Sequence, residues 1–304
     1  MEIANLNLKG ELRRNEQMSR HTSFGIGGPA DVLAWPADRD DLLALLQTVR
    51  KKKLPYFILG GGTNLLVRDN GFRGVVISLR RMNRIALERE YASVGGSFGV
   101  VFAEAGASLP KLVSFAAEQG FTGLEFAAGI PGTVGGAVCM NAGTALGEIG
   151  GIIDTVTLVS PEGGLISRGQ DEMGFGYRTS SVPEGHLVLE ASVVLRRGDS
   201  AEIKARVQEL LDTRKERQPW GLPNAGSMFK NPREGAAGRL IEEAGLKGRR
   251  VGNAQVSEKH ANFIVNLGKA SAADVLQLME IVQQAVFEKH RVRLEPEIKI
   301  IGEE

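Results

Sequence analysis

The 304-residue sequence has very little of what metal, disulfide and membrane proteins need. Its single cysteine, Cys139, cannot form an internal disulfide or a thiolate cluster. Four scattered histidines without an H-E-x-x-H pattern argue against a catalytic zinc site. We therefore expect no metal centre, and we expect Cys139, between Val138 and Met140, to be a buried and unreactive small residue.

Long apolar runs and a strong net charge are missing as well. No stretch of about 18 apolar residues is present to span a membrane, and the N-terminal residues lack an apolar core of signal-peptide length. The formal net charge is +1, so no global field favours nucleic acid. These absences predict a cytoplasmic protein without a membrane segment or a nucleic-acid partner. An anionic ligand would need a local basic cluster.

Glycine, in contrast, is abundant, with 39 residues. The stretch 127–143, AAGIPGTVGGAVCMNAG, contains five glycines and no charged residue, so it is not typical of a solvated surface. Repeated glycine indicates unusual backbone dihedral angles or the close approach of another body. The stretch either wraps a large ligand with phosphate groups or makes tight turns between packed elements.

A second glycine-rich stretch, 59–67 (LGGGTNLLV), follows a short apolar run at 56–58. A strand that leads into consecutive glycines can present successive backbone N–H groups to an anion. The glycine triplet lacks the Lys-Ser/Thr pair of a Walker A loop and the spacing of a G-x-G-x-x-G fingerprint. A hairpin turn is the alternative interpretation of this stretch.

The apolar periodicity along the chain predicts an α+β protein. Helices are expected at 38–52, 109–119, 201–217, 238–244 and 272–290. Strands are expected at 31–35, 56–60, 75–79, 92–94, 100–105, 154–159, 164–167, 187–196, 263–267 and 293–301. Residues 1–20 are expected to form a short helix and a linker, and Ser108 to cap the helix that follows it. These elements form a small α/β unit at 1–80, an antiparallel sheet with helices at 81–205, and an α+β domain at 206–304.

Three short motifs carry polar side chains after the glycine-rich stretches. Arg178, in Tyr177-Arg178-Thr179-Ser180, is on its residues alone a surface arginine before a hairpin. Ser227 lacks the G-x-S-x-G context of a nucleophile, so a turn or capping serine is the default interpretation. Strand alternation at 293–301 would place Glu297 and Lys299 on one face, where both could meet one site.

Together the two glycine-rich stretches resemble the flavin-binding domain of the vanillyl-alcohol oxidase and p-cresol methylhydroxylase superfamily. With the motifs at 177–180, 224–232 and 294–302, the chain resembles the UDP-N-acetylenolpyruvoylglucosamine reductase family over nearly its whole length. The connection from Tyr177-Arg178 to the strand at 187–196 is short and contains no further tyrosine. The chain therefore resembles the second, shorter type of this family, in which a tyrosine lid is not expected.

The resemblance implies an FAD-binding module of two subdomains, 1–80 and 81–205, followed by a substrate-binding domain at 206–304. It implies an NADPH-dependent oxidoreductase that converts UDP-N-acetylglucosamine enolpyruvate to UDP-N-acetylmuramate in peptidoglycan precursor synthesis. NADPH reduces FAD, and the flavin then delivers hydride to the vinyl carbon of the substrate. The implied catalytic residues are Ser227, which protonates the adjacent carbon, and Arg178 and Glu297, which act on the substrate carboxylate or the enol-like intermediate.

The resemblance also implies the ligand contacts. FAD is expected to be bound without a covalent link, because neither glycine-rich stretch contains a histidine. The expected FAD contacts are Gly60, Gly61, Gly62, Thr63, Asn64, Leu65, Gly129, Ile130, Pro131, Gly132, Gly135, Gly136, Ala137 and Asn141. The expected substrate contacts are Arg214, Arg217, Asn231, Lys247 and Lys299, with His260 and Asn262 as further candidates. A monomer is expected.

Two alternative functions are open at this point. A flavin oxidase of the same superfamily would act on an alcohol or a sugar, and many such enzymes attach FAD through a histidine, which these stretches lack. A non-catalytic sugar-nucleotide sensor would have a degenerate flavin site. The presence of Arg178, Ser227 and Glu297 argues against the sensor.

Overall fold

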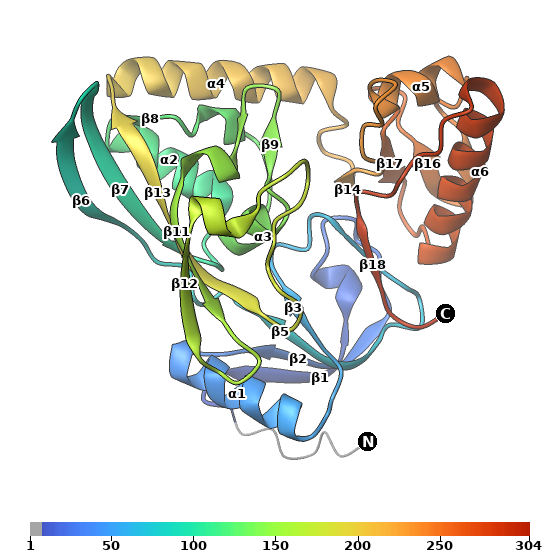
Figure 1. Ribbon diagram of the computed structural model, residues 1–304. Coiled ribbons are helices and arrows are strands. Elements are labelled where there is room, and N and C mark those ends of the chain that lie inside the picture. Colours follow the sequence, from blue (N-terminus) through green and yellow to red (C-terminus); the bar gives the residue numbers. More distant parts are fainter. Residues whose placement is uncertain (1–7) are drawn as a thin grey trace. The chain divides into compact units, whose positions relative to one another are not determined.

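The computed structural model describes residues 8–304, and the chain forms two compact units. The first unit contains residues 8–12, Ala34–Gly61 and Val76–Thr213. The second contains Arg13–Leu33, Gly62–Val75 and Arg214–Glu304. Both units mix helices and strands, which confirms the predicted α+β class (Figure 1). The predicted boundaries at residues 80 and 205 stay a prediction.

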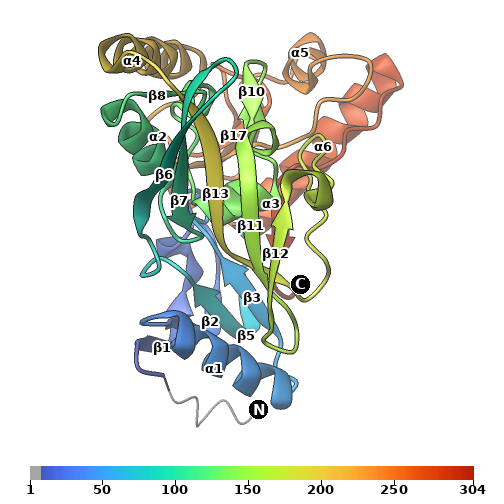
Figure 2. The same ribbon diagram turned by 60° about the vertical axis from the view of Figure 1, so that its left-hand side comes forward.

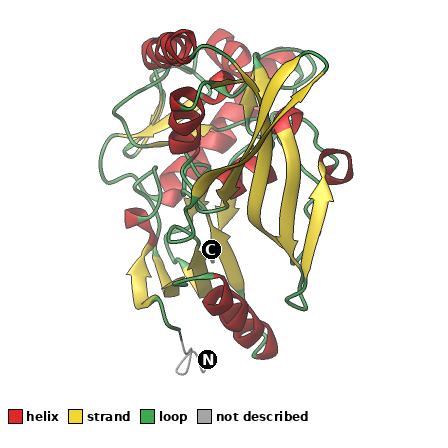
Figure 3. Cartoon of the chain, turned by 90° about the vertical axis from the view of Figure 1, so that its left-hand side faces the viewer, coloured by secondary structure: helices red, strands yellow, loops and turns green. Residues whose placement is uncertain are grey.

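The first unit is built on a six-stranded antiparallel sheet with the order β12–β11–β13–β7–β6, in which β8 pairs with β13. Figures 2 and 3 show its long strands side by side. Buried valines pair at its centre, where Val193 of β13 lies opposite Val101 of β7. The strands are β6 (Ile85–Ser93), β7 (Gly96–Glu104), β8 (Phe121–Thr122), β11 (Ile153–Val159), β12 (Leu165–Gly169) and β13 (Leu187–Arg197).

Helices of the first unit form where apolar residues recur at helical spacing. In α1 the Asp38 side chain accepts a hydrogen bond from the Asp41 N–H at 2.8 Å, which caps the helix, and Leu42, Leu46 and Val49 are buried. The helices are α1 (Arg39–Lys51), α2 (Leu109–Glu118), α3 (Val134–Cys139) and most of α4 (Ser200–Arg217). The short elements are β9 (Gly143–Thr144), β10 (Gly147–Glu148) and the 3-10 helices η2 (Glu125–Ala127), η3 (Ile149–Ile152) and η4 (Gln170–Met173).

The second unit has a four-stranded antiparallel sheet with the order β14–β17–β16–β15, on which α6 packs (Figure 1). Phe24, Phe229, Ile241, Val275 and Val286 belong to its buried core. The elements are η1 (Met18–Arg20), β14 (Asn224–Ser227), α5 (Ala237–Glu243), β15 (Arg250–Val251), β16 (Ala254–Val256), β17 (Phe263–Asn266) and α6 (Ala272–His290). A parallel pair, β4 (Leu65–Val67) and β18 (Lys299–Ile301), completes the unit.

A further sheet has the order β1–β2–β5–β3. Its strands are β1 (Glu11–Gln17), β2 (Pro29–Trp35), β5 (Phe72–Ser78) and β3 (Tyr56–Leu59). The boundary between the units falls inside β1, β2 and β5, so the chain passes from one unit to the other along these strands.

Several elements differ from their prediction. Residues 11–17 form β1 and 18–20 a 3-10 helix, where a helix and a linker were expected, while residues 1–7 of that prediction lie outside the described residues. The strand predicted at 293–301 is limited to Lys299–Ile301, because Pro296 has no N–H for a ladder. The strand predicted at 92–94 is longer, Ile85–Ser93, and its exposed charged residues conceal the alternation. Ser108 occupies the N-cap of α2, but its side chain makes no capping hydrogen bond.

Cys139 is exposed, which contradicts the prediction of a buried thiol. The stretch 127–143 is not entirely a loop, because Val134–Cys139 forms α3 and Cys139 is its last residue. The buried face of this helix is made by Val134, Ala137 and Val138, which leaves Cys139 on the outer side.

Candidate functional site

Gly60, in the part of the first glycine-rich stretch that belongs to the first unit, lies against the second stretch. A Cβ built on Gly60 would come within 2.8 Å of the Thr133 Oγ1, so only a residue without a side chain passes beside the start of α3. Thr133 is the N-cap of α3 and accepts a hydrogen bond from the Gly136 N–H at 3.5 Å. A backbone brought this close, in segments without charged side chains, fits a cofactor held by backbone groups, as FAD would be.

Within the second stretch, Gly135 is required by the packing of the chain against itself. A Cβ built on Gly135 would lie 2.8 Å from the Cβ of Ala105, at the end of β7, and the Gly135 N–H donates to the Ala105 carbonyl at 2.9 Å. Pro131 and Gly136 are exposed. The packing of α3 therefore explains Gly135, whereas Pro131 and Gly136 present the surface that a ligand could meet.

Asn141 is fully buried, and its side chain is occupied by the chain itself. Its amide nitrogen donates to the Gly176 carbonyl at 3.0 Å, and its oxygen accepts from the Gly150 N–H at 2.8 Å. Asn141 thus fixes the turn that carries Arg178. Its predicted contact with the cofactor stays a prediction.

Arg178 occupies a backbone conformation that arginine rarely adopts. Gly176 and Thr179 exchange two backbone hydrogen bonds, of 3.1 and 3.2 Å, around the two-residue turn Tyr177-Arg178, and Arg178 has a φ of 56°. This left-handed region costs a non-glycine residue roughly 1–2 kcal/mol. The guanidinium donates to the Gly143 carbonyl at 3.0 Å and lies 5.2 Å from the centre of the Tyr177 ring. The surrounding hydrogen bonds therefore hold Arg178 in a strained turn.

In the second unit, Ser227 ends β14 at an irregularity of the sheet. Asn224 pairs with Val265 and Ser227 with Phe263, so β14 has one more residue than β17 over this interval. A bulge of this kind redirects the side chains that follow it. The half-buried Ser227 is therefore aimed by the bulge and not by regular strand alternation.

Glu297 is hydrogen-bonded to the segment that follows Ser227. The Glu297 N–H donates to the Met228 carbonyl at 2.8 Å, and the Lys230 N–H donates to the Glu295 carbonyl at 2.9 Å. On its other side, the Glu297 carbonyl accepts from the Asn64 side chain at 3.1 Å. Two of the predicted catalytic residues, far apart in the sequence, thus belong to neighbouring segments. Arg178 belongs to the first unit.

The predicted ligand residues at 62–65 also belong to the second unit, whereas Gly60 and Gly61 belong to the first. Asn64 was predicted to contact FAD. Its side chain holds Glu297, and its carbonyl accepts from the Lys299 N–H at 3.0 Å. The end of the first glycine-rich stretch is therefore tied to the segment that contains Glu297.

The predicted substrate contacts are distributed over the second unit. Arg214 is half-buried and Arg217 exposed at the end of α4, and Lys299 is exposed. The Lys247 ammonium donates to the Glu242 carboxylate at 2.6 Å. The Asn231 side chain accepts from the N–H of Ala237, the first residue of α5, at 2.9 Å. Asn231 thus has a structural contact, and its contact with substrate stays a prediction.

Ser23 is a residue that the sequence interpretation missed. Its hydroxyl donates to the Asn224 carbonyl at 2.6 Å, and its N–H donates to the Gly62 carbonyl at 3.0 Å. It therefore joins the first glycine-rich stretch to the strand that ends at Ser227. No local pattern could have revealed this role, because both partners are distant in the sequence.

His260 and Asn262, the further candidates, contact each other. The Asn262 N–H donates to the His260 Nδ1 at 3.2 Å, and the His260 ring meets the Phe263 ring edge-on at 4.9 Å. Burial lowers the pKa of His260, and the charge of Lys247 lowers this pKa further. His260 is therefore a neutral imidazole near pH 7, with its proton on Nε2.

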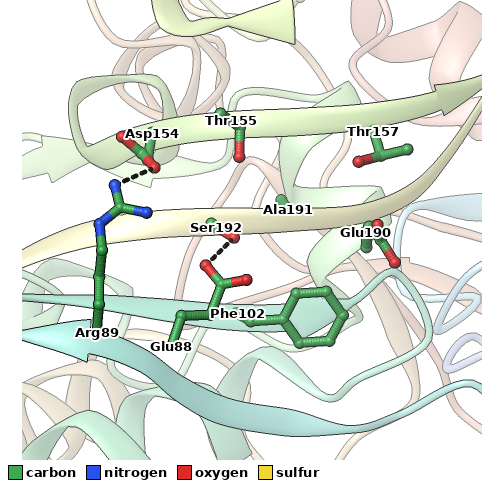
Figure 4. Close-up of a pocket in the computed structure, with 9 residues that line it drawn as sticks. All are labelled: Glu88, Arg89, Phe102, Asp154, Thr155, Thr157, Glu190, Ala191 and Ser192. Carbon is green, nitrogen blue, oxygen red and sulfur yellow. Dashed lines mark hydrogen bonds and ion pairs between the residues drawn. The ribbon is translucent and has the colours of Figure 1, made fainter. Parts of the chain in front are cut away.

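A polar depression lies on the large sheet of the first unit, lined by residues of β6, β7, β11 and β13 (Figure 4). Figure 4 shows Arg89 facing Asp154, at 3.3 Å, and Glu88 facing Ser192, at 2.9 Å. These two pairs account for four of the polar groups that line the depression. Among residues 8–304, no group of three or more potential metal-binding side chains occurs. No helix in the same range has the length and apolarity needed to cross a membrane.

The chain is similar to known proteins over both of its parts. Residues 30–168 match the family profile "FAD binding domain", and 218–301 match "UDP-N-acetylenolpyruvoylglucosamine reductase, C-terminal domain". A relative named UDP-N-acetylenolpyruvoylglucosamine reductase, from Caldanaerobacter subterraneus subsp. tengcongensis, is 48% identical over 97% of this chain and 95% of its own.

Solved structures give the same correspondence. The crystal structure of UDP-N-acetylenolpyruvylglucosamine reductase from Thermus caldophilus matches with a TM-score of 0.80 and 39% identity, over 97% of this chain and 99% of that one. The 6-hydroxy-D-nicotine oxidase from Arthrobacter nicotinovorans matches with a TM-score of 0.54 and 14% identity, over 95% of this chain and 88% of that one. At that identity, the second likeness concerns the fold alone.

Proposed function

The chain belongs to the UDP-N-acetylenolpyruvoylglucosamine reductase family, and from this membership we propose its reaction, its site residues and its setting. It is an FAD-containing oxidoreductase that converts UDP-N-acetylglucosamine enolpyruvate to UDP-N-acetylmuramate at the expense of NADPH. The product is a precursor of peptidoglycan.

The cofactor is assigned to the two glycine-rich stretches, with Gly60–Leu65 and Gly129–Ala137 as the holding segments. The contact of Gly60 with Thr133 supports this assignment, because it brings two segments without side-chain charge together. When bound, FAD supplies hydride transfer between NADPH and the substrate carbon. The chain itself binds and orients the cofactor and the substrate, and its side chains move the proton.

Ser227 is proposed as the proton donor. Hydride addition to the vinyl methylene leaves the electron pair on the adjacent carbon, which then takes the hydroxyl proton of Ser227. Arg178 has a permanent positive charge for the substrate carboxylate, where negative charge accumulates during this step. Glu297 is proposed as the third catalytic residue, and like Arg178 it would act at the carboxylate end of the substrate.

The single observation that supports these roles best is the hydrogen bond from the Glu297 N–H to the Met228 carbonyl, at 2.8 Å. It ties the glutamate directly to the residue after Ser227. The polar residues Arg214, Arg217, Asn231, Lys247 and Lys299 are proposed to contact the UDP-sugar. We propose further that the enzyme is a cytoplasmic monomer.

The visible spectrum of the purified protein tests the proposal. NADPH should bleach the flavin absorbance, and UDP-N-acetylglucosamine enolpyruvate added without oxygen should restore it, with UDP-N-acetylmuramate appearing by mass spectrometry. A sensor would leave the spectrum unchanged on addition of NADPH. An oxidase would be reduced by an alcohol or a sugar, and its flavin would not be reoxidised by the enolpyruvyl substrate.

A further inference from the structure

Asn262 is a buried asparagine whose side chain holds the segment that follows Ser227. Its oxygen accepts from the Phe229 N–H at 3.0 Å, and its nitrogen donates to the Phe229 carbonyl at 2.8 Å. Its own carbonyl accepts from the Met228 N–H at 2.8 Å. Asn262 is 4% exposed, so loss of one of these bonds would leave a polar backbone group unpaired away from water.

These bonds begin where the sheet ends. Ser227 pairs with Phe263, and beyond that pair the chain turns, with the Phe263 N–H donating to the His260 carbonyl at 3.0 Å. β17 therefore has no further residue in line to pair with Phe229. The Asn262 side chain supplies the donor and the acceptor that another residue of β17 would have supplied.

The same segment is held along its other side by the glutamate segment. Met228 accepts from the Glu297 N–H at 2.8 Å, and Phe229 forms a β-bridge with Pro296. Met228 and Phe229 are thus fixed between Asn262 and the chain at 296–297. A shift of this segment would move both Ser227 and Glu297.

We propose that Asn262 is a positioning residue for proton transfer, an inference that rests on the function proposed above. Its amide fixes the backbone after the β14 bulge, so that the Ser227 hydroxyl is aimed at the substrate carbon. Asn262 acts through Ser227 and needs no contact with substrate or cofactor for this role. A misplacement of about 1 Å in a reacting group can cost on the order of 10²-fold in rate.

The test variant is Asn262→Asp, which keeps an acceptor for the Phe229 N–H and loses the donor to the Phe229 carbonyl. The chain offers a matched control in Asn266, a buried asparagine at the other end of β17. Its nitrogen donates to the Phe24 carbonyl at 3.1 Å, and its oxygen accepts from two backbone N–H groups, of Gly268 and Ala270. Asn266→Asp therefore loses the same kind of bond without touching the segment after Ser227.

Stopped-flow absorbance separates flavin reduction by NADPH from flavin reoxidation by the enolpyruvyl substrate. In Asn262→Asp we expect reoxidation to slow by about 10- to 100-fold, with unchanged flavin content, an unchanged NADPH step and a larger solvent deuterium isotope effect on reoxidation. In Asn266→Asp we expect the ratio of the two rates to stay at the wild-type value. If the carboxylate prevents folding, Asn262→Ser, which is neutral and too short to reach both groups, should show the same selective slowing.

A double-mutant cycle with Ser227→Ala identifies the route of the effect. If Asn262 acts by aiming the hydroxyl, Asn262→Asp should slow reoxidation little further once that hydroxyl is gone. Multiplicative effects, or equal slowing of both steps in Asn262→Asp, would overturn the inference. Failure of the proposed function would be seen differently. The wild type would then not convert the enolpyruvyl substrate, or the flavin of Ser227→Ala would be reoxidised at the normal rate. Either result would also overturn the inference about Asn262.

Discussion

At the scale of single residues, the chain adopts locally unfavourable conformations where the proposed chemistry needs a particular geometry. Arg178 has a φ of 56°, although glycine would occupy that turn without strain. Ser227 follows a bulge, which interrupts the pairing of β14 with β17. Each feature is unfavourable locally and is held by surrounding bonds, such as that from Asn141 to Gly176 at 3.0 Å. Strain that the surroundings maintain is typical of functional sites.

Ser227→Ala should block one half of the reaction. General acid assistance is worth roughly 10²- to 10⁴-fold in the step it serves, so flavin reoxidation by the enolpyruvyl substrate should slow by that order. Reduction by NADPH should keep its normal rate, because no proton from Ser227 enters that step. Ser227→Cys should retain more activity than the alanine variant. Stopped-flow absorbance measures both steps.

A control serine separates this effect from general damage. The Ser200 hydroxyl donates to the Ala117 carbonyl at 2.7 Å in the first unit, so Ser200→Ala should leave both steps unchanged. Equal slowing of both steps in Ser227→Ala would mean that Ser227 positions the flavin or the domain. No slowing would show that its assignment as proton donor is wrong.

At the scale of elements, α6 shows how side chains from distant segments stabilise a helix. Ser271 and Asp274 form a capping box at its N-terminus. The Asp69 carboxylate adds two bonds, accepting from the N–H groups of Ala272 at 2.8 Å and Ala273 at 3.0 Å. The first turn of α6 is thereby tied to the loop after β4, within the second unit.

Asp69→Ala should lower the free energy of unfolding by about 1–2 kcal/mol, because it removes two hydrogen bonds and a negative charge from a helix N-terminus. Urea denaturation followed by circular dichroism measures this change. Asn70→Ala is the control, because the Asn70 side chain donates to the Glu304 carbonyl and does not meet α6. A control as destabilised as Asp69→Ala would assign the effect to the loop and not to the cap.

At the scale of the whole molecule, each unit has a buried carboxylate held in its charged form. Burial by itself raises the pKa of Asp41 in the first unit, but the N–H groups of Ala37, Lys9 and Gly10 outweigh it and hold the pKa below its usual value. In the second unit, the hydrogen bond with His21 at 2.9 Å lowers the pKa of Glu16. Both carboxylates therefore favour the folded state when ionised.

Acid should consequently weaken the fold through these two groups. Because each folded-state pKa lies below its unfolded value, the stabilisation is complete above the unfolded pKa of about 4 and is lost as the pH falls through the folded pKa. Asp41→Asn should lower stability at pH 7 and flatten its decline below about pH 4. Urea titrations across that range measure both effects. Asp40→Asn, at an exposed neighbouring position, should retain the wild-type decline.

Acid denaturation also tests how the flavin is attached. If FAD is held by the backbone of the two glycine-rich stretches and by no covalent bond, acid precipitation should leave the yellow colour in the supernatant. The absorbance spectra of pellet and supernatant decide the point. Flavin that stays in the pellet after washing would contradict non-covalent binding.

Local patterns were sufficient to predict the five longer helices of this protein, but not α3, and they placed a helix within residues 1–20 where β1 forms. The helices predicted at 38–52, 109–119, 201–217, 238–244 and 272–290 all occur within one residue at each end, because apolar periodicity and capping residues act within a few positions. The fold class was predicted from the apolar periodicity, and the family was recognised by the resemblance of its short motifs. The short strands β14, β15 and β16 were not predicted, because they lack a sustained alternation.

Tertiary structure alone decides which polar groups meet. The Asn64 amide donates to the carbonyl of Glu297, a residue 233 positions away. Asp69 caps a helix that begins 203 positions later, and Asn262 completes the bonding of Phe229, 33 positions before it. Hydrogen bonds form only within about 3 Å and at restricted angles. Such partners therefore become known only once folding has placed distant segments in register, whereas helix periodicity can be read from adjacent residues.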